Sequence, residues 1–109
     1  MAWEVWIYES ERGEKLVEEF ISTLEASTIA KVSHLIDLLE IHGPFLGTPH
    51  TKKVSPNLYE LRIRGHQEVR ILYTFFNNKI CLLSGFQKQT QKTPSKEIEI
   101  ALGRRAKIS

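Results

Sequence analysis

With 109 residues, 41% of them hydrophobic and 26% charged, the chain has the composition of one globular domain over residues 1–109 and is too short for two. Its single cysteine, Cys81, excludes an internal disulfide and a cysteine-based zinc site, which suits a reducing compartment. There is no signal-peptide pattern and no run of 18 apolar residues, so the sequence predicts a cytoplasmic protein that does not interact with a membrane.

The net charge of +2 conceals a strong asymmetry along the chain. Residues 1–50 carry 3 basic and 9 acidic side chains, a balance of −6, whereas residues 51–109 carry 12 basic and 4 acidic ones, a balance of +8. This asymmetry favours a surface for a polyanion or for an acidic partner; the alternative is solvated faces that merely segregate.

The first half predicts one strand and two helices. Residues 3–8 alternate weakly and are rich in strand formers. Apolar residues then recur at helical spacing over about residues 10–24 and again over about residues 27–42, where Gly43-Pro44 stops the second helix. The short break between them predicts an α-hairpin.

The second half predicts a loop, three strands and a helix. The loop covers residues 45–57, and the remaining elements are strands over residues 58–64, 68–76 and 79–86 and a helix from Thr93-Pro94 to about Lys107. The order β-α-α-β-β-β-α predicts an α+β domain, in which a small antiparallel meander sheet carries its helices on one face.

Two arginines are predicted to face each other in the first hairpin of the meander. If Gly65-His66-Gln67 closes that hairpin symmetrically, Arg62 opposes Arg70 on one face of the sheet, and Arg64 opposes Glu68. Opposed guanidinium groups repel, whereas a phosphate would bind both, so loss of Arg70 is expected to spare folding. The alternative is an Arg62–Glu60 or Arg64–Glu68 ion pair on a solvated face.

A second candidate patch follows the last predicted strand. Phe86 offers a face on which a base could stack, and Lys88 and Lys92 supply charges for phosphates. Glutamines at 87, 89 and 91 could read base edges. The remaining candidate RNA contacts are Arg64, Gln87, Lys52, Lys53 and His66.

Four blocks of sequence resemble a known family. They are LYELR from Leu58, VRILY from Val69, GFQKQTQKTP from Gly85 and EIEIA from Glu97. In this order and spacing they resemble the phage-derived, HigB-like branch of the RelE/HigB-type toxin superfamily. The resemblance is close over residues 58–105 and looser over residues 1–40.

The resemblance implies a RelE-like fold and the toxin of a type II toxin–antitoxin pair that cleaves mRNA on the ribosome. The four histidines and the cysteine lack the spacing of metal ligands, so we expect no metal and no cofactor. The implied partner is a helix-turn-helix antitoxin. The implied reaction is attack of an RNA 2′-hydroxyl on its adjacent phosphate. Arg62 and Arg70 would stabilise the charge, and Lys88 or Lys92 would protonate the leaving oxygen or position the backbone.

Two departures from the family pattern leave the general base unassigned. Gln89 stands where much of the branch has lysine, and no tyrosine follows Tyr73. His66 is a candidate proton carrier, although a histidine in a turn is more often only solvated. Two other functions stay open: a ParE-like module that inhibits DNA gyrase without cleaving RNA, and an inactive prophage remnant.

Overall fold

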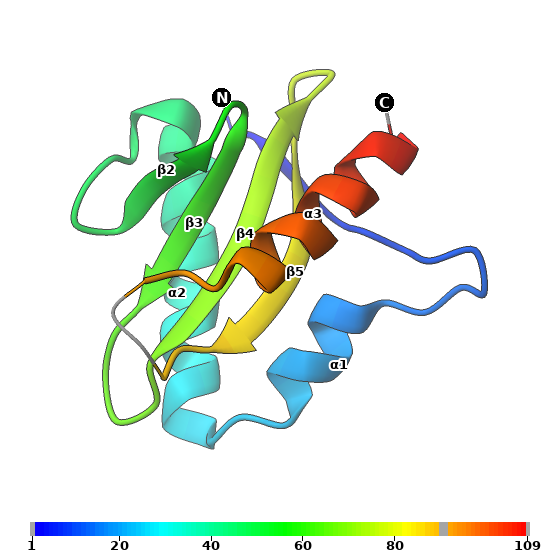
Figure 1. Ribbon diagram of the computed structural model, residues 1–109. Helices are drawn as coiled ribbons and strands as arrows, with labels where there is room; N and C mark the ends of the chain where they lie inside the picture. Colours follow the sequence, from blue (N-terminus) through cyan, green and yellow to red (C-terminus); the bar gives the residue numbers. More distant parts are fainter. Residues whose placement is uncertain (1, 90–91, 109) are drawn as a thin grey trace.

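A computed structural model describes residues 2–89 and 92–108, which form a five-stranded sheet between helices (Figure 1). The first part of the chain contains β1 (Glu4–Ile7), α1 (Leu16–Ser22), α2 (Ala26–His42) and a short 3-10 turn, η1 (Gly43–Phe45). The second part contains β2 (Thr51–Ser55), β3 (Leu58–Ile63), β4 (Val69–Phe76), β5 (Lys79–Gln87) and α3 (Ser95–Ile108). The chain is thus α+β, as the sequence predicts.

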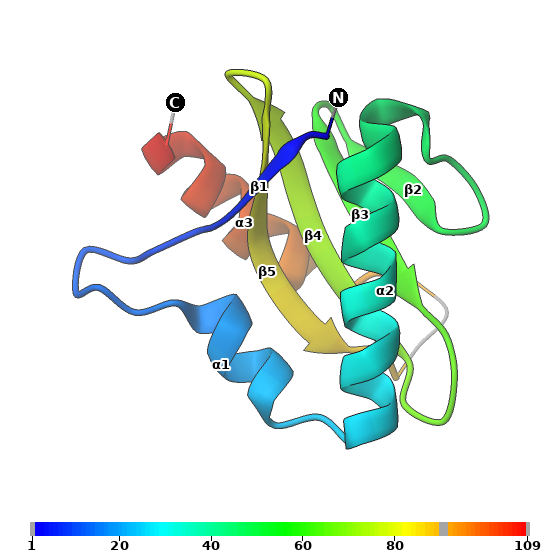
Figure 2. The same cartoon turned by 180° about the vertical axis from the view of Figure 1, so that it is seen from behind.

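The sheet is mixed and has the strand order β1-β5-β4-β3-β2. Strands β2 to β5 are antiparallel neighbours, whereas β1 pairs in parallel with β5 (Figure 2). The meander of β3, β4 and β5 was predicted, and Asn77 and Asn78 close its second hairpin at positive φ. The prediction of a purely antiparallel sheet is wrong, because β1 adds to the edge of the sheet by pairing in parallel with β5.

An additional strand occupies part of the predicted loop. β2 pairs with the outer edge of β3, with Thr51 opposite Leu61 and Lys52 opposite Glu60. Edge strands are commonly short and carry lysines, which discourage further pairing. The sequence does not predict β2, because Lys52 and Lys53 interrupt the alternation of apolar and polar residues by which a strand is recognised.

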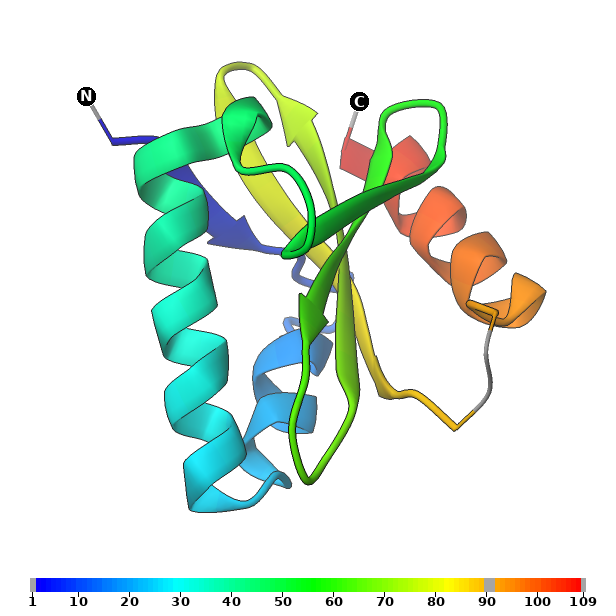
Figure 3. The ribbon, with the colours of Figure 1, turned by 90° about the vertical axis from the view of Figure 1, so that its left-hand side faces the viewer.

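Helices cover both faces of the sheet, so the prediction of helices on one face is also wrong. Figure 3 shows α2 on one side of the sheet and α3 on the other, with α1 on the side of α2. The physical reason lies in β4, whose residues from Val69 to Thr74 are all buried. A strand that buries consecutive residues must be covered on both faces, since successive side chains point in opposite directions.

The two faces have separate cores. The larger core lies beneath α1 and α2 and includes Val32, Leu39, Leu61 and Ile71. The smaller core lies beneath α3, where Ala101 packs with the sheet residues Leu58, Leu72, Leu83 and Phe86.

Along the described ranges 2–89 and 92–108, no helix is both long enough and apolar enough to cross a membrane.

Candidate functional site

Arg62 and Arg70 lie directly opposite each other on β3 and β4, as the sequence predicts. On the far side of β4, Phe86 of β5 opposes Arg70, so the three side chains form one row across the sheet. The next row contains Glu60 and its partner Leu72. Both rows belong to the face that carries α3.

Glu60 places a negative charge between the two arginines. Its side chain is 1% exposed, and its Oε1 atom lies 3.7 Å from Nε of Arg62 and 3.5 Å from Nε of Arg70. The expected Arg62–Glu60 and Arg64–Glu68 ion pairs both exist, the latter at 3.9 Å. The prediction that the two guanidinium groups face each other without a counter-charge is therefore wrong. The alternative of an Arg62–Glu60 ion pair on a solvated face is also wrong, because Glu60 is buried.

Arg70 is a buried residue, contrary to its predicted exposure toward a phosphate. Its side chain is 1% exposed, donates from Nη1 to the Val69 carbonyl oxygen at 2.9 Å, and donates from Nη2 to Glu68 at 3.3 Å. Removing it would leave Glu60 short of a partner in a low-dielectric site. Contrary to the expectation from the sequence, we therefore predict that loss of Arg70 impairs folding.

The outward-facing cation of the row is Arg62, whose side chain is 20% exposed. The Nε atoms of Arg62 and Arg70 are buried and have no hydrogen-bond acceptor among the described residues. Each of them nevertheless lies at ion-pair distance from the Glu60 carboxylate, at 3.7 Å for Arg62 and 3.5 Å for Arg70. Because Arg70 is buried, Arg62 is the cation of the row that an anion from solvent could contact.

Lys88 joins this group from the end of β5. Its backbone N–H donates to the Glu68 carbonyl oxygen at 2.7 Å, which holds the half-buried side chain near the arginines. Burial lowers the pKa of Lys88, and the positive charge of Arg70 lowers it further. An ammonium group with a lowered pKa gives up its proton more readily than an ordinary lysine does.

Thr93 closes the site from the other side. Its hydroxyl donates a hydrogen bond to Oε2 of Glu60, which ties the segment before α3 to the arginine pair. We call Glu60, Arg62, Arg70, Lys88 and Thr93 the Glu60 cluster. Lys92, the neighbour of Thr93, is exposed, and Gln91 lies outside the described residues.

The structure disagrees with the prediction that Phe86 stacks on a base. Phe86 is 8% exposed and packs in the smaller core with Leu83 and Ala101. Its aromatic face is thus used in folding, because α3 covers this part of the sheet. Gln87, the next residue, is exposed.

The remaining predicted contacts are spread over the molecule. Lys52 opposes Glu60 and shares its face, whereas Lys53 opposes Tyr59 and belongs to the other face. Arg64 pairs with Glu68 beside the hairpin turn. His66 is 82% exposed at that turn, with Nε2 3.6 Å from the carboxylate of Glu25. Only Lys52 therefore extends the row of Glu60.

Sequence reasoning missed Glu60 and Thr93 as members of the site. Its alternation with apolar residues in β3 predicts a solvated position for Glu60, whereas the structure buries it. The available signal is β4, which is apolar on both faces apart from Arg70 and Thr74 and so predicts that both faces of the sheet are covered there. Nothing in the sequence around Thr93 indicates its contact across 33 residues with Glu60.

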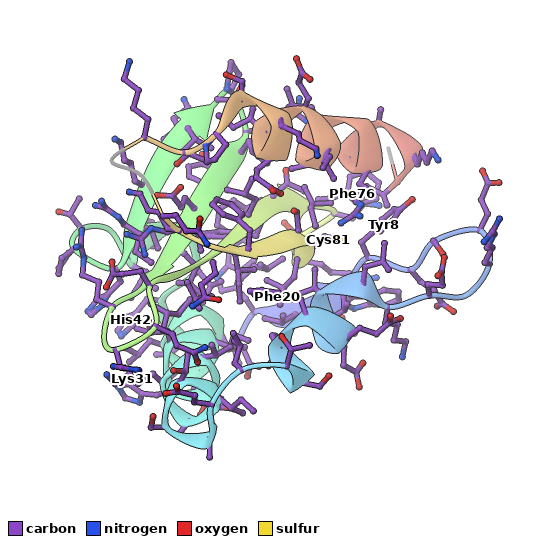
Figure 4. The ribbon with its side chains drawn as sticks, turned by 60° about the horizontal axis from the view of Figure 1, so that its bottom comes forward. Tyr8, Phe20, Lys31, His42, Phe76 and Cys81 are labelled. Carbon is purple, nitrogen blue, oxygen red and sulfur yellow. The ribbon has the colours of Figure 1, made fainter. Side chains whose placement is uncertain are left out.

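Metal and thiol chemistry receive no support from the part of the chain that the structure describes. Residues 2–89 and 92–108 contain no group of three or more histidine, cysteine, aspartate or glutamate side chains placed to hold a metal ion. Burial raises the pKa of the Cys81 thiol to about 11, so the thiolate is scarce at neutral pH. Figure 4 shows Cys81 between the layers of the fold, as a core residue.

Comparison with known proteins agrees with the motifs of the second half. The family model described as "Phage derived protein Gp49-like" matches residues 19–106. A relative from Mycobacterium tuberculosis, named "Putative toxin HigB3", is 40% identical over 75 residues, which is 63% of this chain and 65% of the relative. The match thus spans just under two thirds of that protein's length. The chain belongs to the phage-derived Gp49-like family, within the RelE/HigB-type toxin superfamily.

Proposed function

We propose that this protein is the toxin of a toxin–antitoxin pair and that it acts as an endoribonuclease on mRNA at the ribosome. The observation that carries the proposal is the Glu60 cluster, in which a buried carboxylate holds two arginines in a row beside Lys88. The name of the mycobacterial relative supports the toxin role. The basic balance of residues 51–109 supports a polyanionic substrate.

In the proposed reaction the RNA supplies its own nucleophile. The 2′-hydroxyl oxygen attacks the adjacent phosphorus, its proton passes to water, and the bond from phosphorus to the 5′-oxygen breaks. The products are a 2′,3′-cyclic phosphate and a 5′-hydroxyl end. The protein therefore needs to align the strand, stabilise the extra negative charge and deliver one proton to the leaving oxygen.

In this proposal, different residues of the Glu60 cluster carry out these tasks. Arg62 would bind the reacting phosphate, since it is the more exposed arginine of the row. Lys88 would protonate the 5′-oxygen, for which a lowered pKa is suitable. Arg70 and Glu60 are positioning residues in this scheme, because both are buried and act through Arg62. Lys52 would contact the backbone of the strand from β2.

The test compares Arg62→Ala and Arg62→Lys with Arg12→Ala, an exposed arginine of the acidic half. Arg62→Ala should lower cleavage on programmed ribosomes by about 10²-fold, the scale of losing a preorganised charge stabiliser. Arg62→Lys should recover part of this, because an ammonium cannot make the bidentate contact. Arg12→Ala should cleave like the unaltered protein.

Pulse labelling in cells distinguishes the proposal from its main competitor. Expression without an antitoxin should stop protein synthesis before DNA synthesis. If DNA synthesis stops first and the mRNA stays intact, a gyrase inhibitor replaces the nuclease. If neither process is affected by a folded protein, the toxin proposal fails.

A further inference from the structure

A pocket separate from the Glu60 cluster lies between β1, the β4–β5 hairpin and the C-terminal end of α3. It has a volume of about 290 Å³. We call it the Trp6 pocket, and its lining consists of Trp6, Phe76, Asn77, Lys79, Cys81 and Ile108. Figure 1 shows this end of α3 at the level of the β4–β5 hairpin, whereas Thr93 of the Glu60 cluster precedes the other end of the helix.

The strand register explains why side chains from different strands meet in this pocket. Trp6 of β1 opposes Cys81 of β5, and Lys79 opposes both Glu4 of β1 and Phe76 of β4. The two rows are adjacent on the face that carries α3, because Cys81 belongs to the smaller core. The sheet thus gathers two aromatic rings, a thiol and an ammonium group near its β1 edge.

The walls of the pocket are apolar and mostly aromatic. Helix α3 contributes Ile108, the residue at which it ends, so it does not cover Trp6, which stays 51% exposed. Cys81 is 8% exposed, and because burial raises the pKa of its thiol, the thiol is neutral and acts as a small apolar group. Such walls favour a flat aromatic ring, which can pack against Trp6 and Phe76 in an offset or edge-to-face arrangement.

Lys79 places a positive charge beside these aromatic walls. Its Nζ atom lies 4.2 Å from the centre of the Trp6 ring, so a cation–π interaction holds the ammonium group at the pocket. Within residues 2–89 and 92–108, no carboxylate lies at ion-pair distance from this ammonium, although Glu4 is opposite Lys79 in the register. Among the described residues that line the pocket, Lys79 is also the one charged side chain.

This combination suits an aromatic molecule with one carboxylate. One ammonium group balances the single charge of a carboxylate, whereas a phosphate monoester carries about 1.5 to 2 negative charges at pH 7 and would stay partly unpaired. The side-chain amide of Asn77, in the hairpin turn, supplies a donor for the second carboxylate oxygen. The volume lies near the lower end of the range for small-molecule sites, about 300–1,000 Å³, which suits a molecule of one or two fused rings.

We propose that the Trp6 pocket binds a small aromatic carboxylate, with its ring packed on Trp6 and Phe76 and its carboxylate paired with Lys79. Such a ligand contacts β1, the β4–β5 hairpin and α3 at once, which are distant from one another in the sequence. The proposal does not rest on the proposed nuclease function, because the pocket shares no residue with the Glu60 cluster.

The binding test compares three compounds by calorimetric titration. Naphthylacetate carries both ring and charge, naphthylacetamide keeps the ring but is neutral, and uridine monophosphate represents a nucleotide. Naphthylacetate should bind with a Kd of about 1 mM or lower, the affinity expected for a ligand of its size. The amide should bind about 5-fold more weakly, because it cannot form a charge-assisted hydrogen bond with Lys79.

Two results of this titration would overturn the proposal. One is equally tight binding of the amide and the acid, or no saturable binding of either. The other is tighter binding of uridine monophosphate than of naphthylacetate, which would make the pocket a nucleotide site instead.

The location is tested with Lys79→Gln, Trp6→Ala and a matched control, Lys107→Gln. Lys107 is an exposed lysine in the last turn of α3 that does not line the pocket. Lys79→Gln should weaken naphthylacetate binding by about 5-fold and change binding of the amide by less than about twofold. Trp6→Ala should weaken both by about 5-fold or more, because it removes an apolar wall. If Lys107→Gln weakens the acid as much as Lys79→Gln does, the proposal fails.

A further measurement locates the ligand in the unaltered protein, so it decides the site even if Trp6→Ala does not fold. The chain has two tryptophans, and Trp3 packs against the larger core with its ring edge-on to Phe75. Naphthylacetate should shift the indole N–H signal of Trp6 in an NMR titration and leave that of Trp3 nearly unchanged; Trp6→Phe identifies the two signals. A shift of the Trp3 signal alone, or of neither, would contradict binding in the Trp6 pocket.

Discussion

Glu60 determines how the cations of the candidate site are held. The negative charge of a carboxylate that is 1% exposed needs nearby positive charges or hydrogen-bond donors. Two arginine Nε atoms within 3.7 Å and the Thr93 hydroxyl supply them for Glu60. The carboxylate also keeps the opposed arginines from repelling each other. A buried acid therefore lets the fold place two guanidinium groups side by side before any phosphate arrives.

Arg70 is expected to be important for stability. Arg70→Ala should reduce the free energy of unfolding by about 3 kcal/mol or more, because it leaves Glu60 buried with one partner fewer. Arg64→Ala, at an exposed pair with Glu68, should change it by less than about 1 kcal/mol. Urea denaturation measures both. Equal effects of the two variants would show that Arg70 contributes little to the fold.

Glu68 is expected to make stability depend on pH in the acid range. The Gly65 N–H lowers the pKa of Glu68, and so do its contacts with Arg70 and Arg64, from an ordinary value of 4.5. A carboxyl group with a lowered folded-state pKa stabilises the fold above its unfolded pKa, and this stabilisation disappears as the pH falls through the folded value.

Glu68→Gln should therefore lower stability at pH 7 and make much less difference near pH 3. Urea midpoints of the two proteins at both pH values give the comparison. A difference that stays constant with pH would mean that the charge of Glu68 does not contribute.

Helix α1 packs closely against strand β5. A Cβ atom added to Gly85 of β5 would lie 2.7 Å from Cδ2 of Phe20 in α1, and Figure 4 shows Phe20 lying between α1 and the sheet. The absence of a side chain at Gly85 thus lets α1 rest on the sheet.

Gly85→Ala should consequently destabilise the protein by about 1–3 kcal/mol, the usual cost of overpacking. Gly103→Ala is the matched control, because an added Cβ there meets no atom within 4 Å and alanine favours the α3 helix. It should raise the thermal midpoint slightly. If Gly85→Ala also raises the midpoint, the contact between α1 and β5 is looser than described.

At the scale of the whole molecule, the charge asymmetry of the sequence becomes an asymmetry between faces. Exposed acids such as Glu18, Glu19 and Asp37 lie on α1 and α2, whereas Lys96 and Lys107 lie on α3 across the sheet. A polyanion should accordingly approach the α3 side, where the Glu60 cluster lies.

Binding of a short single-stranded RNA should therefore depend on salt. The logarithm of its affinity should fall with the logarithm of salt concentration, by a slope of about 0.7 for each phosphate contact. Lys52→Gln and Lys88→Gln should each reduce that slope by about 0.7, and Lys15→Gln in the acidic half should leave it unchanged. Fluorescence anisotropy from about 50 to 200 mM salt measures it. A common slope for all four proteins would exclude Lys52 and Lys88 from RNA contact.

What could be predicted from the sequence depends on short-range patterns. The Arg62–Arg70 register follows from the symmetric hairpin turn between them, and the turn at Asn77 and Asn78 follows from the positive φ that asparagine tolerates. The helices follow from apolar spacing. Each of these features depends on residues that are close in sequence, so a short segment is enough to predict it.

Only the tertiary structure decided which side chains of the candidate site are exposed. The same alternating pattern that placed Glu60, Arg62 and Arg70 on one face cannot say whether that face is solvated, because α3 and the segment with Thr93 cover it from more than 20 residues away. Burial of Arg70 and Phe86 follows from that cover. The sequence alone thus determined the strand register and the row of charges. The packing of a distant helix determined that Glu60 and Arg70 form a buried pair and that Arg62 is the more exposed arginine of the row.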